Sequence, residues 1–264
     1  MKPLLENDVA VVTGAASGNG RAISMALAEH GADVVVSDVR KRPRGGGRPT
    51  HETINQETDS EATYVECDVT SSEDIERAVR AADQFGDLSI MVNNAGVTEQ
   101  IDFLSIDRDG YDRIMETNVW GTFAGAQLAA ERMIAQSTAG SIITMSSIIG
   151  FTGRGDGVTY STSKGAVRLM TYAMADALGS HGIRVNAVHP GLIRTAMSTD
   201  DVEVIGTDAE ERYKQQSALG RVGQPEDVAG AVVYLASPLA DFVTGESIIV
   251  DGGLVNIQGG GWDS

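Results

Sequence analysis

The sequence predicts an α/β fold, in which one doubly wound parallel sheet of about seven strands carries helices on both faces. Short runs rich in β-branched residues alternate with longer segments of helical period along the whole chain, which is typical of repeated strand–helix–strand units. Several of the short runs are apolar at every position, as expected of strands covered on both faces. The 264 residues contain no linker and no internal repeat, so we expect one domain spanning residues 1–264.

The individual elements can be assigned in order along the chain. The strands are predicted at Val9–Thr13, Asp33–Ser37, Thr63–Glu66, Leu88–Val92, Ser141–Met145, Arg184–Val188 and Ser247–Val250. The helices between them are predicted at Gly20–His30, Ser72–Gln84, Tyr111–Ala135, Thr159–Ser180 and Pro225–Ala236. Ser71 or Ser72 is expected to cap the second of these helices. Sheets of this kind bind ligands at the carboxyl ends of their strands, near the switch in strand order, so the site is expected there.

Two segments do not fit regular structure. Residues 40–49 hold five positive charges, three glycines and two prolines, which predicts an exposed loop. Residues 192–220 are rich in charge and in Thr, Ser and Gly. They follow directly after a strand, so we expect them to form a mobile lid over the site.

The charge balance is strongly acidic. Thirty-seven acidic residues face 20 basic ones, which gives a formal net charge of −17. Such a surface repels phosphate backbones, so nucleic-acid binding is not expected. The lysines are few: Lys2, Lys41, Lys164 and Lys214. This composition favours a protein of a halophile, because dense counterions in a saline cytoplasm screen self-repulsion. A moderately acidic cytosolic protein is the alternative.

The cellular location and the absence of a metal site are predicted from features that the sequence does not contain. There is no apolar run of about 18 residues and no basic, apolar leader at the N-terminus, so we expect a cytoplasmic protein without membrane spans. Cys67 is the one cysteine, which excludes an internal disulfide. The four histidines show no ligand spacing, so no metal site is predicted.

A glycine-rich loop follows the first strand. Gly14, Gly18 and Gly20 let the backbone turn tightly and approach a ligand closely, and Ser17 and Asn19 lie between them. The helix that begins here offers free N–H groups and the positive end of its dipole, which suits a pyrophosphate. A glycine trio alone is a weak signal, but the strand–loop–helix context makes it strong evidence for a dinucleotide site.

Asp38 ends the second strand, 18 residues beyond Gly20. An acid at about this distance binds the adenosine ribose hydroxyls and repels a 2′-phosphate, so it favours NAD over NADP. The adjacent basic loop is evidence in the other direction, because Arg40 or Arg42 could pair with a phosphate.

These motifs, with those that follow, resemble the short-chain dehydrogenase/reductase family in its single-domain branch, over nearly the whole chain. The resemblance implies a Rossmann-type sheet. The matching segments are Thr13–Gly20, Asn93–Gly96, Thr117–Gly121, the Ser147, Tyr160 and Lys164 triplet, Pro190–Thr195, Val243–Gly245 and Asp251–Gly253. Asn19 departs from the pattern, because the family usually has an aliphatic residue there.

The resemblance also implies which residues hold the coenzyme. Asp68 and Val69, at the end of the third strand, resemble the pair that contacts adenine. An acid that merely ends a strand is an equal alternative for Asp68. The remaining coenzyme-binding residues implied are Asn94, Ala95, Gly96, Tyr160, Lys164, Pro190, Ile193 and Thr195.

Four residues carry the expected chemistry. Tyr160 and Lys164 are four apart and share one face of a helix. A nearby ammonium and the oxidised nicotinamide would stabilise the phenolate and lower the pKa of Tyr160, so that it can exchange a proton with the substrate oxygen. Ser147 would hydrogen-bond that oxygen. By resemblance, Asn118 anchors a water relay behind the lysine.

We therefore expect an NAD(H)-dependent oxidoreductase that interconverts a secondary alcohol, such as a sugar or polyol, and a ketone. An NADPH-dependent 3-oxoacyl thioester reductase is the first alternative. A non-catalytic NAD-binding regulator is the second, although all four catalytic residue types are present. The expected partner is a small-molecule substrate, and the resemblance implies a homotetramer formed through the long fourth and fifth helices.

Overall fold

The computed structural model describes residues 3–256, in which seven strands form one sheet in the order β3-β2-β1-β4-β5-β6-β7. Every neighbouring pair is parallel. The strands are β1 Val9–Thr13, β2 Asp33–Asp38, β3 Ala62–Glu66, β4 Leu88–Asn93, β5 Gly140–Met145, β6 Ile183–Pro190 and β7 Ser247–Val250. The predicted sheet is thus confirmed, and the strand order reverses between β1 and β4.

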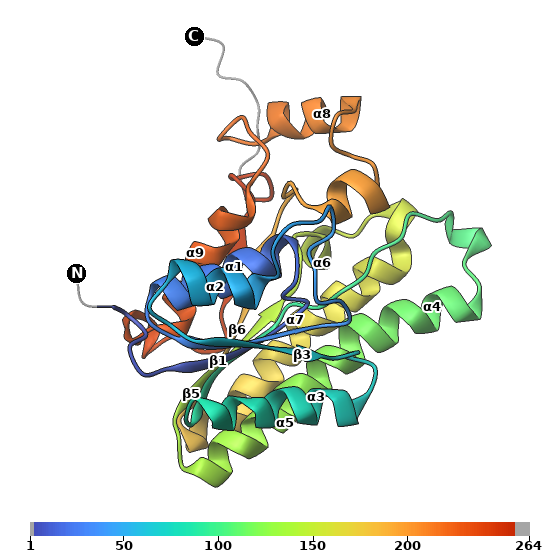
Figure 1. The fold of residues 1–264 in the computed structure, drawn as a ribbon. Coiled ribbons are helices and arrows are strands. Elements are labelled where there is room, and N and C mark those ends of the chain that lie inside the picture. Colours follow the sequence, from blue (N-terminus) through green and yellow to red (C-terminus); the bar gives the residue numbers. More distant parts are fainter. Residues whose placement is uncertain (1–2, 257–264) are drawn as a thin grey trace.

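Helices cover both faces of the sheet (Figure 1). They are α1 Gly18–Glu29, α2 Thr50–Glu57, α3 Ser72–Ala81, α4 Arg108–Met115, α5 Gly121–Gln136, α6 Ile149–Thr152, α7 Val158–Leu178, α8 Asp208–Gln216 and α9 Pro225–Ala236. Helices α1, α2 and α9 lie on one face, and α3, α5 and α7 lie on the other.

Strand β1 explains why the strand runs are apolar at every position. Ala10 and Val12 belong to the core beneath α1 and α9. Val9 and Val11 belong to the core beneath α3 and α5. Because successive side chains of a strand point to opposite faces, a strand between two cores needs an apolar residue at each position.

The segment Tyr111–Ala135 is helical throughout, as predicted, but it is not one regular α-helix. Helix α4 ends at Met115, residues Glu116–Trp120 form a wider π-helical turn, and α5 begins at Gly121. A Cβ atom on Gly121 would lie 2.8 Å from Val69 Cγ2, so the chain approaches the end of β3 closely there. The wide turn also directs Asn118 into the interior, where it is fully buried.

Three of these helices were not predicted. Helix α2 follows the basic loop, α6 lies between β5 and α7, and α8 lies inside residues 192–220. Helices α2 and α8 are short and mostly polar, and α6 has only four residues, so all three carry little apolar periodicity to detect. The basic loop itself contains no helix or strand, as predicted, and Ser71 rather than Ser72 caps α3 by accepting a hydrogen bond from the Asp74 N–H.

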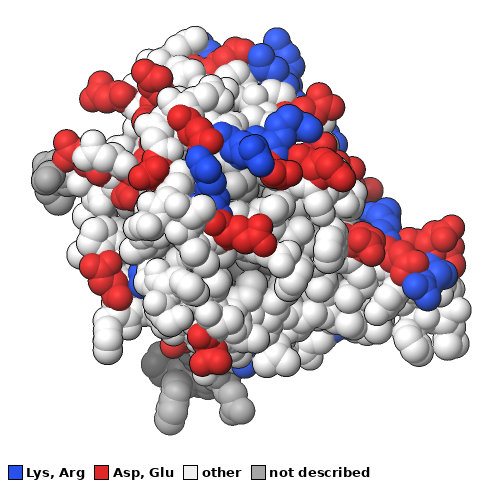
Figure 2. Space-filling view, turned by 90° about the horizontal axis from the view of Figure 1, so that it is seen from below, with Lys and Arg blue, Asp and Glu red and all other residues white. Residues whose placement is uncertain are grey.

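The surface carries interleaved charges. Figure 2 shows acidic and basic side chains alternating over part of one face, beside a broad area without charged groups. Among the described residues, no helix is both long and apolar enough to cross a membrane.

Candidate active site

The glycine-rich loop lies at the carboxyl end of β1, where the strand order reverses. Gly14 and Gly18 have φ angles of 63° and 53°, which disfavour a residue with a side chain. A Cβ atom on Gly20 would collide with the carbonyl oxygen of Gly14. Asn94, after β4, holds the loop because its Nδ2 donates to the carbonyl oxygens of Thr13 at 2.9 Å and Gly14 at 3.1 Å. The backbone of the glycine-rich loop is therefore held in a fixed conformation, and its three glycines place no side chain between that backbone and a ligand.

The start of α1 fits the pyrophosphate of a dinucleotide. Ser17 is the residue before the helix, and no side chain caps the first-turn N–H groups. No acidic residue occupies that turn, so the positive end of the helix dipole is not neutralised locally. Asn19 lies in the same turn, and its Oδ1 is buried without a hydrogen-bond partner within the described chain.

Asp38 lies against this loop. Its Oδ2 accepts a hydrogen bond from the Ala16 N–H at 3.0 Å, and its Oδ1 accepts one from the Arg40 N–H at 3.0 Å. Burial raises the pKa of Asp38, and these two N–H groups counteract the rise. The structure thus brings the predicted ribose acid next to the predicted phosphate loop.

Ser147, Tyr160 and Lys164 come together from the end of β5 and the first turns of α7. Ser147 and Lys164 are buried, with 8% and 5% of their surfaces exposed, and Tyr160 is half-buried. The Lys164 Nζ lies 5.7 Å from the centre of the Tyr160 ring and donates to the Met145 carbonyl oxygen at 2.8 Å. The Ser147 Oγ accepts from the Ile149 N–H at 3.2 Å.

Among the protein's own groups, the expected lowering of the Tyr160 pKa does not occur. Burial raises the pKa of Tyr160, and the Ser147 hydrogen bond and the Arg154 charge only partly offset that rise. Burial lowers the pKa of Lys164 to about 8. The ammonium is directed at the Met145 carbonyl, so its attraction for a phenolate does not outweigh the loss of solvent. Tyr160 therefore rests as a protonated donor.

Asn118 lies behind these residues in the π-helical turn. Its Oδ1 accepts from the Val97 N–H at 2.8 Å, and its Nδ2 donates to the Val97 carbonyl at 2.9 Å and to the Ser163 Oγ at 3.0 Å. A Cβ atom on Gly96 would lie 3.2 Å from Asn118 Oδ1 and 3.5 Å from Lys164 Nζ. Asn118 is thus adjacent to the lysine, and its amide donates once to the chain after β4 and once to α7.

The other predicted coenzyme residues fall into two groups. Thr195 lies next to the glycine loop, because a Cβ atom on Gly18 would be 3.2 Å from its Cγ2. The same edge of the sheet carries the other members of this group. At the carboxyl ends of β4 and β6, or just beyond them, lie Ala95, Gly96, Pro190 and Ile193.

Asp68 and Val69 form the second group. The Asp68 carboxylate accepts hydrogen bonds from the Thr70 N–H and hydroxyl, at 2.9 and 2.8 Å. Val69 is buried. Asp68 therefore closes a local turn at the end of β3, and its side chain is engaged there.

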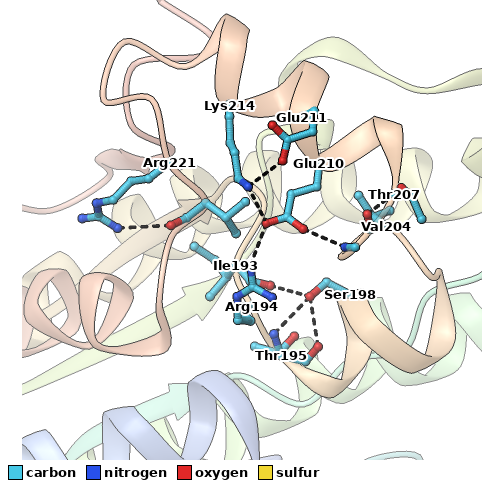
Figure 3. Close-up of polar contacts among 12 residues, drawn as sticks. Ile193, Arg194, Thr195, Ser198, Val204, Thr207, Glu210, Glu211, Lys214 and Arg221 are labelled. Atoms are coloured by element: carbon cyan, nitrogen blue, oxygen red, sulfur yellow. Dashed lines mark hydrogen bonds and ion pairs between the residues drawn. The ribbon is translucent and has the colours of Figure 1, made fainter.

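The segment 192–220 is folded by its own polar contacts (Figure 3). Glu210 is 5% exposed and lies within 2.6 Å of Arg194 and 3.1 Å of Lys214. It also accepts from the Gly206 N–H at 2.7 Å. Ser198 donates to the Ile193 carbonyl at 2.7 Å, so this bond closes a local turn within the segment.

Arg44 is a residue that sequence reasoning did not single out. Its guanidinium binds both carboxylate oxygens of Asp201 at 2.7 Å and lies 3.5 Å from Asp200. Its backbone N–H donates to the Ser17 Oγ at 2.7 Å. The basic loop thus connects the glycine-rich loop with segment 192–220. Nothing in the local sequence pairs residues 157 positions apart, and only the opposite charges gave a signal.

Within the described part of the chain, no three His, Cys, Asp or Glu side chains lie close enough together to hold a metal ion.

Comparison with known proteins agrees with this geometry. The family model described as Enoyl-(Acyl carrier protein) reductase matches residues 14–255. The chain is 37% identical over 260 residues to an L-rhamnose 1-dehydrogenase (NAD(P)(+)) of Sphingomonas sp. strain SKA58, covering 97% of this chain and 99% of that protein. It is 36% identical to the 3-oxoacyl-[acyl-carrier-protein] reductase FabG of Aquifex aeolicus, covering 96% and 100%.

A solved structure has the same fold. A short-chain type dehydrogenase/reductase from Mycobacterium marinum superposes with a TM-score of 0.87 at 34% identity, covering 96% of this chain and 97% of that one. The chain belongs to the short-chain dehydrogenase/reductase family. This membership confirms the predicted family and the Rossmann-type fold, and it supports oxidoreductase activity on an alcohol or ketone with a nicotinamide coenzyme.

Proposed function

We propose that this short-chain dehydrogenase/reductase is NAD-dependent and interconverts a secondary alcohol of a sugar or polyol with the corresponding ketone. The observation that carries the proposal is the convergence of Ser147, Tyr160 and Lys164 beside the bare glycine loop. A sugar substrate is favoured by the 37% identity to an L-rhamnose dehydrogenase over nearly the full length of both chains.

The residues would hold the coenzyme as follows. The backbone from Gly14 to Gly20 faces the pyrophosphate. Asp38 accepts hydrogen bonds from the adenosine ribose. Lys164 and Tyr160 border the nicotinamide half, together with the segment from Pro190 to Thr195. The bound coenzyme supplies or accepts the hydride.

The chain itself moves the proton. The Tyr160 hydroxyl would donate a proton to the substrate oxygen during reduction, and the Tyr160 phenolate would accept the proton from the substrate hydroxyl during oxidation. Ser147 donates a hydrogen bond to the same oxygen and fixes its position. Lys164 supplies positive charge beside the phenol, which stabilises the phenolate left after proton transfer. Asn118 holds the chain behind the lysine through Val97.

The choice between NAD and NADP rests on Asp38 and the basic loop. The Asp38 carboxylate lies against the phosphate loop, where it would repel a 2′-phosphate. The Arg44 guanidinium is occupied by Asp201, and Arg42 donates to the Gly47 carbonyl within its own loop. An NADPH-dependent 3-oxoacyl thioester reductase remains the second candidate, favoured by the 36% identity to FabG of Aquifex aeolicus.

A coenzyme and substrate panel separates the two candidates. L-rhamnose, other aldoses and polyols, and an acetoacetyl thioester are each assayed with both coenzymes. Our proposal predicts oxidation of a sugar with NAD⁺ at a higher kcat/KM than with NADP⁺. Efficient reduction of the thioester with NADPH, without sugar oxidation, would replace it by the second candidate.

Tyr160→Phe tests the catalytic assignment. Loss of a general acid–base group predicts a fall in kcat of about a thousandfold, while the dissociation constant of NADH, measured by fluorescence, stays within about twofold. Tyr111→Phe, at an exposed position of α4, is the matched control and should keep full activity. Turnover retained in Tyr160→Phe would remove Tyr160 from this role.

We also propose a homotetramer. Trp120 and Phe123 are 40% and 39% exposed on the outer side of α5 and the turn before it, and their rings stack at 5.8 Å. Exposed aromatic pairs of this kind mark interaction surfaces. Light scattering on the purified protein gives the mass directly, and Trp120→Glu is expected to reduce it.

A further inference from the structure

His189 is a fully buried histidine that the proposed reaction does not use. It lies near the end of β6, immediately before Pro190, and the Phe151 ring packs on it at 4.5 Å. Its Nδ1 lies 3.1 Å from the Ser147 carbonyl oxygen, and its Nε2 lies 2.9 Å from the Ser247 Oγ. The ring therefore contacts the backbone of a residue placed at the reacting oxygen.

The partners fix the tautomer of this ring. The Ser147 carbonyl can only accept, so the Nδ1 must carry the hydrogen and donate it. Burial, together with the charges of Arg168 and Lys164, lowers the pKa of His189 to about 4, so the ring is neutral near neutral pH. Its Nε2 is then an acceptor, and the Ser247 hydroxyl must donate to it.

The direction of the next bonds follows. Because the Ser247 hydroxyl donates its one hydrogen to His189, the Tyr172 hydroxyl must donate to the Ser247 Oγ, at 2.8 Å. Arg168 Nε donates to the Tyr172 hydroxyl at 3.1 Å, as a guanidinium can do nothing else. One directed chain of hydrogen bonds thus runs from Arg168 through Tyr172, Ser247 and His189 to the Ser147 carbonyl. Each donor in such a chain polarises the next.

We propose that His189 is a positioning residue for Ser147, and that the chain from Arg168 holds it in the donating tautomer. The inference rests on the proposed function, which places the Ser147 hydroxyl at the reacting oxygen. Removal of the His189 donor does not orphan the Ser147 carbonyl, because the Gly150 N–H also donates to it at 3.0 Å. The loss therefore loosens the Ser147 peptide, and with it the hydroxyl, more than it unfolds the protein.

Two substitutions of His189 separate its two nitrogens. In His189→Asn the side-chain amide occupies the place of Nδ1 and can still donate to Ser147. In His189→Gln the amide reaches the place of Nε2, so the Ser247 contact is kept and the Ser147 contact is lost. A residue that merely fills space or stabilises β6 would not distinguish the two.

The assay uses the purified protein with L-rhamnose and NAD⁺, or with the panel compound that the wild type oxidises fastest. We expect His189→Gln to lower kcat about tenfold, because a small displacement of a positioning group is costly in rate. The dissociation constant of NADH should not change, and His189→Asn should recover activity to within about threefold of wild type. Equal kcat values for the two variants would overturn the proposal.

A double-mutant cycle keeps this outcome distinct from that of the proposed function. Ser147→Ala alone tests the proposed function, and its full activity would remove Ser147 from the reaction. If His189 acts through Ser147, adding His189→Gln to Ser147→Ala should change the residual kcat by less than about twofold, since coupled residues are not additive. A further tenfold loss would show that His189 acts elsewhere and would refute the inference.

Ser247→Ala provides the second test if His189→Gln does not fold. It leaves the imidazole in place but removes the hydroxyl that holds the tautomer, so kcat should fall about threefold at an unchanged melting temperature. An unchanged kcat in this variant would contradict the proposed chain.

Discussion

Lys164 is a charged side chain held in an interior that does not favour charge. It is 5% exposed, and its Nζ donates to the Met145 carbonyl at 2.8 Å. Burial lowers its pKa from 10.5 to about 8. The site therefore keeps a cation beside Tyr160 at some expense of stability, as functional sites often do.

This expense should be visible in the pH dependence of unfolding. Between pH 8 and 10.5 the unfolded chain binds more protons at Lys164 than the folded chain, so the contribution of this residue to stability rises with pH. Lys164→Met removes the buried charge. At pH 7 its free energy of unfolding should exceed that of the wild type by on the order of 3 kcal/mol, and its melting temperature should be higher. This difference in stability should shrink as the pH approaches 10. Its dehydrogenase activity should be lost.

Lys214→Met is the matched control for that measurement. Lys214 is partly exposed, and hydrogen bonds to Glu211 and Glu210 raise its pKa. Its removal should not stabilise the protein at pH 7. A Lys164→Met variant less stable than wild type at neutral pH, or with a gap that does not change with pH, would contradict the account.

At the scale of elements, the basic loop and segment 192–220 meet next to the start of α1. The Arg44 guanidinium and the Asp201 carboxylate form a two-bond pair, and the Arg44 N–H binds the Ser17 Oγ. The side chains are about one-third exposed, at 29% and 35%. The pair therefore connects two loops that border the proposed pyrophosphate site, with partial access to salt.

Arg44→Gln should speed coenzyme release. A surface ion pair contributes up to about 1 kcal/mol, so the dissociation rate of NADH in stopped-flow fluorescence should rise about two- to fivefold at low salt. Molar KCl should abolish the difference, because it screens the pair. Arg108→Gln, which removes an exposed pair within α4, should leave the rate unchanged. A rate unaffected by Arg44→Gln at low salt would show that the loops are not held by this pair.

Hydrophobic periodicity predicts some element boundaries of this chain and misses others. The strands were predictable to within one or two residues, because a central strand buries every position. The start of α9 was predictable because the helix begins at a proline and has two acids in its first turn. The break between α4 and α5 was not predictable. This π-helical turn depends on Gly121 meeting Val69 and on Asn118 binding Val97, and both contacts come from loops that follow other strands.

For the molecule as a whole, the net charge of −17 is the main electrostatic feature. Most of its ion pairs are partly exposed, so they do little to offset the repulsion among the excess acids. Stability should therefore depend on ionic strength.

The melting temperature should rise as KCl increases from about 0.1 M to about 1 M, over which the screening length falls from about 10 Å to about 3 Å. Activity should persist in molar salt if the acidic surface is an adaptation to a saline cytoplasm. Potassium chloride is preferred to sulfate, which strengthens apolar burial by exclusion. A melting temperature that falls or stays constant would refute the saline interpretation.

The sequence by itself determined the sheet, and short-range rules also located the glycine loop and Asp38, which we propose as the phosphate loop and the ribose acid. The Ser147, Tyr160 and Lys164 triplet was predicted from the family resemblance. Alternating burial, glycine conformations and the four-residue helical repeat act between near neighbours. Only the tertiary structure decided the direction of the Tyr160 pKa, the Arg44–Asp201 pair and the His189 chain to Ser147. Desolvation and contacts between distant segments depend on how the helices pack on the sheet, and no local pattern of residues records that packing.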